Sequence, residues 1–220
     1  MSVSHAPMRH LEELLERYPL LKGTCCETIR DAYRKLEHCI QGGGKLLVCG
    51  NGGSAADAEH LVGELMNRYR FTRRLSPSDR AALTAAAGDD APFLCRHLQP
   101  AVAAISLVSQ SALVTSVSND ISAEVIFAQQ VFAYGHPGDT LIALSTSGDS
   151  RNVVLAAATA KARGMSVLGL CGATGGKLRV LCDICICVPQ TEACKVQELH
   201  LPVYHTLCAM LEETLFIPAQ

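Results

Sequence analysis

The sequence predicts an α/β fold, a doubly wound five-stranded parallel sheet flanked by helices, in one domain over residues 1–220. Short apolar runs alternate with stretches of helical periodicity, which is typical of βαβ units. Hydrophobic residues make up 49% of the chain and charged residues 18%, a balance that excludes a disordered chain. Only 5% of residues are aromatic and Trp is absent, so small aliphatic side chains must fill the core. That composition suits closely packed helices and buried parallel strands.

The expected strands are short apolar runs, most of them separated by helical stretches. In chain order they are residues 45–49, 102–108, 140–144, 166–170 and 184–188. The first follows Gly42, Gly43 and Gly44, which end the N-terminal helical segment.

Helices are expected where apolar residues recur with a period near 3.6. They are residues 8–41 with interruptions near Pro19 and Gly23, 55 to about 69, 122–134, 152–163, and 191 to about 216. The N-terminal helices thus occupy residues 1–42 of the domain. Pro202 lies inside the last helix, where it could introduce a kink.

Residues 72–99 interrupt this alternation and are interpreted as a helical insertion. Ser76, Pro77 and Asp79 form a typical helix start before an Ala-rich stretch. A structureless loop of about 30 residues would be unusual inside a compact domain. Three roles stay open for the insertion: it lines or covers an active site, it alters a subunit interface, or it is a surface helix without a function.

Charge and hydropathy limit the kinds of partner and the cellular compartment that we expect for this protein. The net charge of −2 shows no basic excess for nucleic acid. No apolar run reaches the roughly 18 residues that a bilayer span needs. The N-terminus lacks an apolar signal core, so we expect a cytoplasmic protein.

The 11 cysteines are accordingly expected to be reduced thiols, mostly buried. Cys182, Cys185 and Cys187 form a C-x-x-C-x-C pattern that could indicate metal or redox chemistry. However, two of the three fall in an expected strand, where alternate residues share one face. A buried structural role is therefore favoured for them.

Two turns from strand to helix are rich in Gly and Ser, at residues 50–54 and 145–150. Such turns present backbone N–H groups at a helix N-terminus, where the helix dipole favours an anion, and hydroxyls can donate to phosphate oxygens. Either turn alone could be a plain tight turn with a Ser cap. Two of them at the carboxyl ends of strands favour a ligand site, because ligands of open α/β sheets bind at that edge.

Two helices carry polar side chains on one face each. His60, Glu64 and Arg68 are spaced by four residues, and Gln197 and His205 are eight apart in an otherwise apolar terminal helix. Taken separately, these are typical of a solvated helix face and a surface amide. Polar groups within an apolar helix, however, need a partner.

Four stretches together resemble the SIS (sugar isomerase) domain family, and within it the phosphoheptose isomerases. They are residues 50–60 (GNGGSAADAEH), 118–120 (SND), 144–150 (LSTSGDS) and 196–200 (VQELH) with His205. The resemblance covers nearly the whole chain except the insertion. It implies isomerisation of sedoheptulose 7-phosphate to D-glycero-D-manno-heptose 7-phosphate through an enediol. It also implies a homotetramer with active sites between subunits, with a sugar phosphate as the ligand and no nucleic acid or membrane partner.

The resemblance also implies roles for individual residues. Glu64 and His205 match the acid/base pair, and His60, Glu64, Gln197 and His205 match a set that holds Zn²⁺ in some members. The substrate-binding residues, with the serines on the phosphate, would be Asn51, Gly52, Gly53, Ser54, Arg68, Asn119, Asp120, Ser145, Thr146, Ser147, Ser150 and Gln197. Asp149 stands where the family usually has Asn, and we expect it to face out of the loop.

A non-catalytic function is the main alternative. Some SIS proteins have lost catalysis, and one class binds the bacterial replication initiator as a regulator. Those relatives lack the residues that Glu64 and His205 supply, so the sequence favours an enzyme.

Overall fold

The predicted five-stranded parallel sheet is confirmed by the computed structural model, which describes residues 5–217. The strand order is β2-β1-β3-β4-β5 and every pairing is parallel. The strands are β1 (Leu46–Cys49), β2 (Ala104–Ser106), β3 (Thr140–Ser145), β4 (Ser166–Cys171) and β5 (Ile184–Cys187). From β1 the chain adds β2 on one side and then β3 on the other, so the winding direction reverses at β1.

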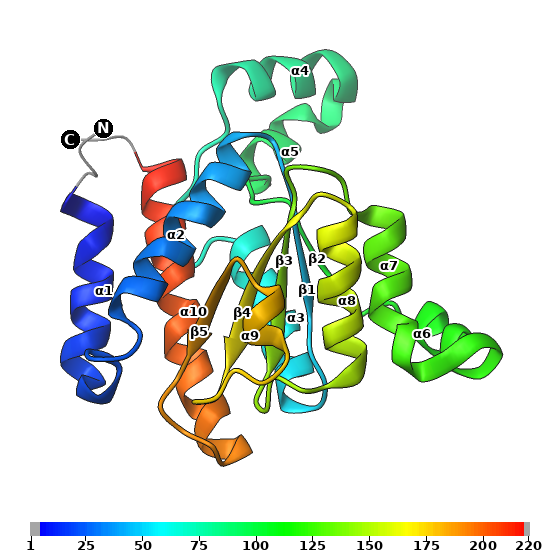
Figure 1. Cartoon of the computed structure of the whole chain (residues 1–220). Helices are drawn as coiled ribbons and strands as arrows, with labels where there is room; N and C mark the ends of the chain where they lie inside the picture. The colour runs from blue at the N-terminus through cyan, green and yellow to red at the C-terminus, as the bar shows by residue number, and fades with distance from the viewer. Residues whose placement is uncertain (1–4, 218–220) are drawn as a thin grey trace.

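Helices cover both faces of the sheet, as a doubly wound fold requires (Figure 1). One face packs against α2 (Cys26–Gln41), α3 (Gly53–Met66) and α10 (Ala193–Phe216), and α1 (His5–Arg17) packs on the outer side of α10 (Figure 1). The other packs against α6 (Ser111–Val117), α7 (Ile126–Tyr134), α8 (Arg151–Ala162) and α9 (Leu178–Leu181). Both cores consist mainly of Leu, Val, Ile and Ala, in line with the scarcity of aromatic residues.

Several helix boundaries differ from the expected ones. Helix α3 starts two residues earlier and ends three residues earlier than expected, at Gly53 and Met66. The expected helix 122–134 is regular only from Ile126, after a 3₁₀ turn at Ala123–Val125. Helix α10 continues through Pro202, whose carbonyl accepts a hydrogen bond from the Thr206 hydroxyl. No helix of the described residues is long and apolar enough to cross a membrane.

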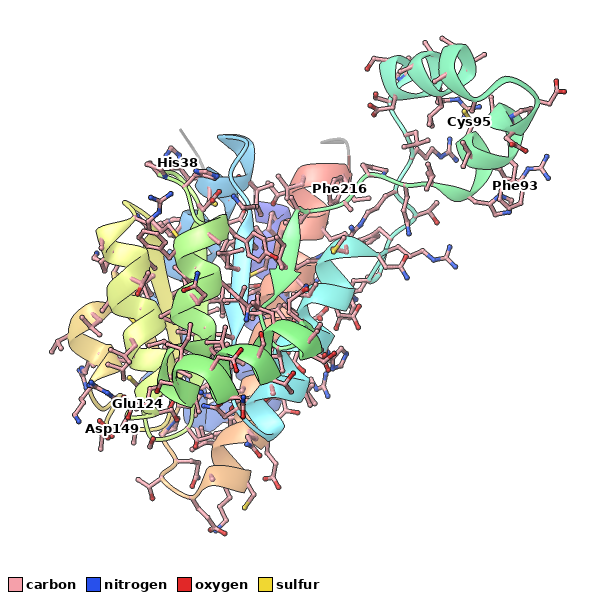
Figure 2. All side chains as sticks on the ribbon, turned by 90° about the vertical axis from the view of Figure 1, so that its right-hand side faces the viewer. His38, Phe93, Cys95, Glu124, Asp149 and Phe216 are labelled. Atoms are coloured by element: carbon pink, nitrogen blue, oxygen red, sulfur yellow. The ribbon has the colours of Figure 1, made fainter. Side chains whose placement is uncertain are left out.

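The segment between α3 and β2 is helical, as expected, and projects from the body of the protein. It contains α4 (Pro77–Ala87), a 3₁₀ turn (Gly88–Asp90) and α5 (Ala91–His97). Ser76 caps α4 by accepting the N–H of Asp79. In Figure 2, Phe93 and Cys95 of this segment lie at the opposite end of the molecule from Asp149. The segment therefore does not cover the Ser-rich loop of its own chain.

Beneath this projection, a buried ion pair fixes the chain that leaves α3. Arg73 Nε lies 2.9 Å from Glu212 Oε1 of α10, with both side chains almost fully buried. Glu212 also accepts the backbone N–H groups of Tyr69, Arg70 and Phe71. The pair thus fixes the start of the projecting segment against the C-terminal helix.

A fully buried histidine on α10 predicts a pH dependence of stability. Burial lowers the pKa of His200 from 6.5 to about 4, against a smaller opposing effect of the Cys171 backbone. Between these values the unfolded chain binds the proton and the folded chain does not. The contribution of neutral His200 to the free energy of unfolding is therefore fully present above pH 6.5 and is lost as the pH falls toward 4. The shift corresponds to about 3 kcal/mol. Denaturant titrations at pH 7 and pH 4 should show a smaller loss for His200→Gln than for the wild type, whereas the exposed His38→Gln should keep the full loss.

Candidate active site

The two Gly- and Ser-rich loops meet at the carboxyl edge of the sheet, because they follow the neighbouring strands β1 and β3. The side-chain amides of Asn51 and Asn152 pair across the two loops. Asn51 Nδ2 donates to Asn152 Oδ1 at 2.8 Å, and Asn152 Nδ2 donates back to Asn51 Oδ1 at 2.9 Å. The structure therefore joins two segments that lie about 100 residues apart at one edge of the sheet, where ligands of such sheets bind.

The loop after β3 is ordered by its own hydroxyl groups. Ser145 is buried, and its Oγ donates to Ser150 Oγ at 3.0 Å and accepts the N–H of Gly148 at 3.1 Å. Ser147 Oγ accepts the N–H of Asp149 at 3.1 Å. Ser150 immediately precedes the 12-residue helix α8. Hydroxyls and N–H groups at this helix N-terminus suit an anion such as a phosphate.

Two further residues of this loop, Gly148 and Asp149, are also compatible with a bound anion. Gly148 has φ +73°, and a Cβ there would lie 2.0 Å from the carbonyl oxygen of Gly175. Only glycine therefore fits this position. Asp149 is exposed, and its carboxylate accepts the N–H of Lys177 at 3.1 Å. The expectation that Asp149 faces out is confirmed.

The loop after β1 brings Gln197 of α10 against the start of α3. A Cβ on Gly53 would lie 2.6 Å from Gln197 Nε2 and 2.8 Å from Oε1, so the amide packs directly on the glycine backbone. Gly52 has φ +56°, a conformation that side-chain-bearing residues rarely adopt. Ser54 is buried in the first turn of α3.

His60, Glu64 and His205 form a compact cluster between α3 and α10. Among the described residues, they are the group of His, Cys, Asp or Glu side chains whose ligand atoms all lie within 4.8 Å of one another. His60 Nε2 lies 3.0 Å from Glu64 Oε1 and 3.4 Å from His205 Nε2. The structure thus brings together His60 and Glu64 of α3 and His205 of α10, which lies 145 residues after His60.

Two side chains that sequence reasoning missed orient His60. Its Nδ1 lies 3.0 Å from the hydroxyl of Tyr204, which itself donates to Asp57 Oδ1 at 3.2 Å. Burial raises the pKa of the Tyr204 hydroxyl, helped by the nearby Asp57 carboxylate, so it stays protonated. With its proton donated to Asp57, Tyr204 can accept the Nδ1–H of His60, and in that tautomer Nε2 is free to bind a metal ion. The available signal was positional, since Asp57 is three residues before His60 on α3 and Tyr204 adjoins His205.

The cluster fits a metal ion in both geometry and protonation. For metal–ligand bonds of about 2.0–2.1 Å, a tetrahedral zinc ion holds its ligands about 3.3–3.4 Å apart. The separations of 3.0 and 3.4 Å around His60 Nε2 are close to that value. Burial, with His60 nearby, lowers the pKa of His205, so its imidazole is neutral near pH 7 as a ligand must be.

The remaining candidates are less closely connected. Asn119 donates to the carboxylate of Asp120 at 2.8 Å on a π-helical turn (Ser118–Ser122), and both are exposed. Thr146 is half-buried, and its carbonyl accepts the N–H of Gly172. The exposed side chain of Arg68 makes no hydrogen bond or ion pair within residues 5–217. Within the described residues, no hydrogen bond or ion pair joins these four residues to the cluster.

Known proteins match this chain along most of its length. The SIS domain family matches residues 10–91 and 94–172, a range that includes most of the projecting segment. The phosphoheptose isomerase of Rhodospirillum rubrum is 40% identical over 193 residues, or 88% of this chain and 89% of that protein.

Solved structures agree with the sequence comparison. A phosphoheptose isomerase from Francisella tularensis superposes with a TM-score of 0.74 at 28% identity, covering 97% of this chain and 100% of that one. For the phosphoheptose isomerase from Neisseria gonorrhoeae the TM-score is 0.70 at 29% identity, covering 94% of both chains. The chain belongs to the SIS domain family, in its phosphoheptose isomerase branch.

Proposed function

We propose that this protein is an isomerase that converts sedoheptulose 7-phosphate into D-glycero-D-manno-heptose 7-phosphate through an enediol. The observation that carries the proposal is the convergence of His60 and Glu64 of α3, a helix that begins at a phosphate-type loop, with His205 of α10. From Gly53 to His60 the helix rises about 10 Å, at about 1.5 Å per residue. That span is comparable with an extended seven-carbon sugar whose phosphate and carbonyl lie at opposite ends.

The Ser-rich loops hold the phosphate in this proposal. Ser54, Ser145, Ser147 and Ser150 donate hydroxyl hydrogen bonds, with Thr146 beside them and with the backbone of Gly52 and Gly53 nearby. Asn51, Asn119 and Asp120 contact the sugar hydroxyls, and Arg68 contacts the substrate. Held by hydroxyls and N–H groups, a phosphate needs no basic patch, which agrees with the near-neutral charge of the chain.

Glu64 and His205 move the protons. A ketose becomes an aldose when a base removes a proton from C1 and a proton is delivered to C2. Glu64 has one carboxylate oxygen on His60 Nε2, which leaves the other to take the C1 proton. His205, neutral near pH 7 because its pKa is lowered, exchanges protons with the substrate oxygens or with C2.

His60, Glu64, Gln197 and His205 would hold one zinc ion per subunit. Two imidazoles, a carboxylate and an amide oxygen form a suitable donor set, with room for a substrate oxygen. When bound, the ion supplies Lewis acidity that polarises the substrate carbonyl. We further propose a cytoplasmic homotetramer with active sites between subunits.

Incubation of the purified protein with sedoheptulose 7-phosphate tests the activity. The aldose should form in zinc-supplemented buffer, and product formation should fall strongly after treatment with a chelator and recover when zinc is restored. Product can be followed by NMR of the anomeric proton. Absence of aldose in the metal-replete sample would instead favour a non-catalytic sugar-phosphate-binding protein.

Gly53→Ala should weaken metal binding without unfolding the protein. The new methyl group would lie 2.6 Å from Gln197 Nε2 and displace the flexible amide rather than the backbone. We expect zinc affinity to fall by about 10–100-fold, as for changes that misplace a ligand. Zinc titration with a competing chelator measures this. The control is Gly63→Ala on the same helix, where an added Cβ meets nothing within 4 Å and affinity should not change. Equal zinc affinity in both variants would exclude Gln197 as a ligand.

A further inference from the structure

Three cysteine thiols gather around Gly169, on the sheet face that packs against α8 and α9, and the thiol of Cys187 lies beside one of them. Cys171 ends β4, Cys185 and Cys187 lie on β5, and Cys182 follows α9. A Cβ on Gly169 would lie 2.7 Å from Cys182 Sγ, 3.1 Å from Cys185 Sγ and 3.8 Å from Cys171 Sγ. The missing side chain of Gly169 thus leaves the space in which these sulfurs meet.

Cys185 is the centre of the group. Its Sγ accepts the S–H of Cys187 at 3.6 Å, and it shares the space beside Gly169 with the thiols of Cys171 and Cys182. These three S–H donors, helped by the charge of Arg179, lower the pKa of Cys185, whereas the pKa of each of its partners is raised. Cys185 is also half-buried rather than sealed in the core. A partly exposed thiolate beside a cation is the usual setting of a reactive cysteine.

The arrangement suits a disulfide better than a metal ion. A tetrahedral thiolate site needs all of its sulfurs close together, but the only cluster of three such ligand atoms within the described residues is the His60 group. A disulfide needs one close pair. Cys171 is fully buried. Cys187 Sγ lies 3.6 Å from Cys185 Sγ, but the two residues are two apart on one strand, so their Cα atoms are about 6.7 Å apart, near the upper limit for a disulfide. Cys182 is half-buried and lies in the turn before β5, so it is the best placed partner for Cys185.

Backbone contacts connect this group to the Ser-rich loop. The N–H of Leu178 in α9 donates to the carbonyl of Gly148 at 3.0 Å, and the N–H of Gly172 donates to that of Thr146 at 2.9 Å. Gly148 and Gly175 are in direct backbone contact. Because Cys182 caps the C-terminus of α9, with its N–H on the carbonyl of Leu178, a movement of Cys182 toward Cys185 would shift the helix that supports residues 145–150.

We propose that Cys182 and Cys185 form a thiol–disulfide switch, oxidised by small-molecule disulfides, that weakens phosphate binding at residues 145–150. The effect on substrate rests on the proposed function, but the disulfide does not. The Cys185 thiolate attacks the small disulfide RSSR, forms a mixed disulfide and releases RS⁻. The Cys182 thiol then attacks the Cys185 sulfur, its proton passes to a released thiolate, and the second RS group leaves. One RSSR is reduced to two thiols as two protein thiols become one disulfide.

The test treats the full chain with oxidised glutathione, alkylates the remaining thiols and maps disulfides by peptide mass. A Cys182–Cys185 disulfide should form, and KM for sedoheptulose 7-phosphate should rise about tenfold or more, since displacements on the order of 1 Å near a site can cost up to about 100-fold. Dithiothreitol should reverse both changes. Cys185→Ser should abolish both, and Cys182→Ser should stop at glutathione bound to Cys185. Cys95→Ser, a change in the projecting segment, should behave like the wild type.

Each contrary result is decisive. The proposed switch is wrong if Cys185 stays fully alkylatable after treatment with oxidised glutathione. It is also wrong if the disulfide joins other cysteines. A second zinc per chain that Cys185→Ser removes would assign the thiols to a metal and overturn it as well. A Cys182–Cys185 disulfide with unchanged KM overturns the coupling to the loop. If the protein shows no turnover before oxidation, the proposed isomerase activity is wrong. The disulfide is still tested in that case, because the peptide mass map does not depend on activity.

Discussion

Replacing Glu64 with Gln is expected to reduce kcat by about 10²–10⁴-fold, the usual contribution of a positioned acid or base. Gln keeps the size of the side chain and an oxygen for hydrogen bonding but cannot take the C1 proton. Sedoheptulose 7-phosphate should still bind, because its phosphate lies at the Ser-rich loops rather than at Glu64. Steady-state kinetics and calorimetric binding of the ketose phosphate measure the two effects separately.

In this variant, an effect of weaker zinc binding must be distinguished from the loss of the proton-accepting carboxylate, since Glu64 Oε1 also contacts His60 Nε2 at 3.0 Å. The assay therefore uses saturating zinc, and the zinc content of each sample is measured. Glu59→Gln, an exposed change on the same helix, is the matched control and should retain activity. Near-normal turnover by zinc-loaded Glu64→Gln would remove Glu64 as the base.

Replacing Arg73 with Met is expected to lower the free energy of unfolding by about 3–5 kcal/mol, the usual effect of removing one partner from a buried ion pair. Only 2% of the Arg73 side chain and 1% of the Glu212 side chain are exposed, so the remaining carboxylate would stay buried without its cation. Arg73 also donates to the backbone carbonyls of Leu65 and Glu64, at 2.9 and 3.1 Å. The substitution therefore also removes the hydrogen bonds that fix the end of α3 next to the proposed base.

Denaturant unfolding measures this effect. Arg74→Met, at the exposed neighbouring position, should change stability by no more than about 0.5 kcal/mol. A loss below about 1 kcal/mol for Arg73→Met would mean that the pair contributes little and that the three backbone N–H groups satisfy Glu212 without it.

The sequence predicts the sheet, and the loops and helices that carry the candidate site, because both rest on local patterns. The apolar run of β3 and the loop that follows it are contiguous in the chain, and the spacing of His60 and Glu64 fixes their common helix face. Helix α6 and the π-helical turn after it were not predicted, since Ser111–Val117 has weak helical periodicity and its packing against α7 determines it.

Contacts between distant segments also escape a pattern-based analysis. The Tyr204–His60 hydrogen bond spans 144 residues, and the Arg73–Glu212 pair spans 139. The convergence of the thiols is of the same kind, because strand periodicity places Cys185 and Cys187 on one face but does not show that Cys171 and Cys182 meet them there. Packing of α9 on the sheet brings about that meeting.

Proton transfer at the His60–Glu64–His205 cluster is the central claim, and solvent isotope incorporation tests it most directly. Zinc-loaded protein is incubated with sedoheptulose 7-phosphate in D₂O, and the product is analysed by NMR and mass spectrometry. Transfer through an enediol by Glu64 predicts an aldose that carries deuterium at C2. No aldose at all, or an aldose that gains no deuterium at C2 even after many rounds of forward and reverse turnover in D₂O, would contradict the account.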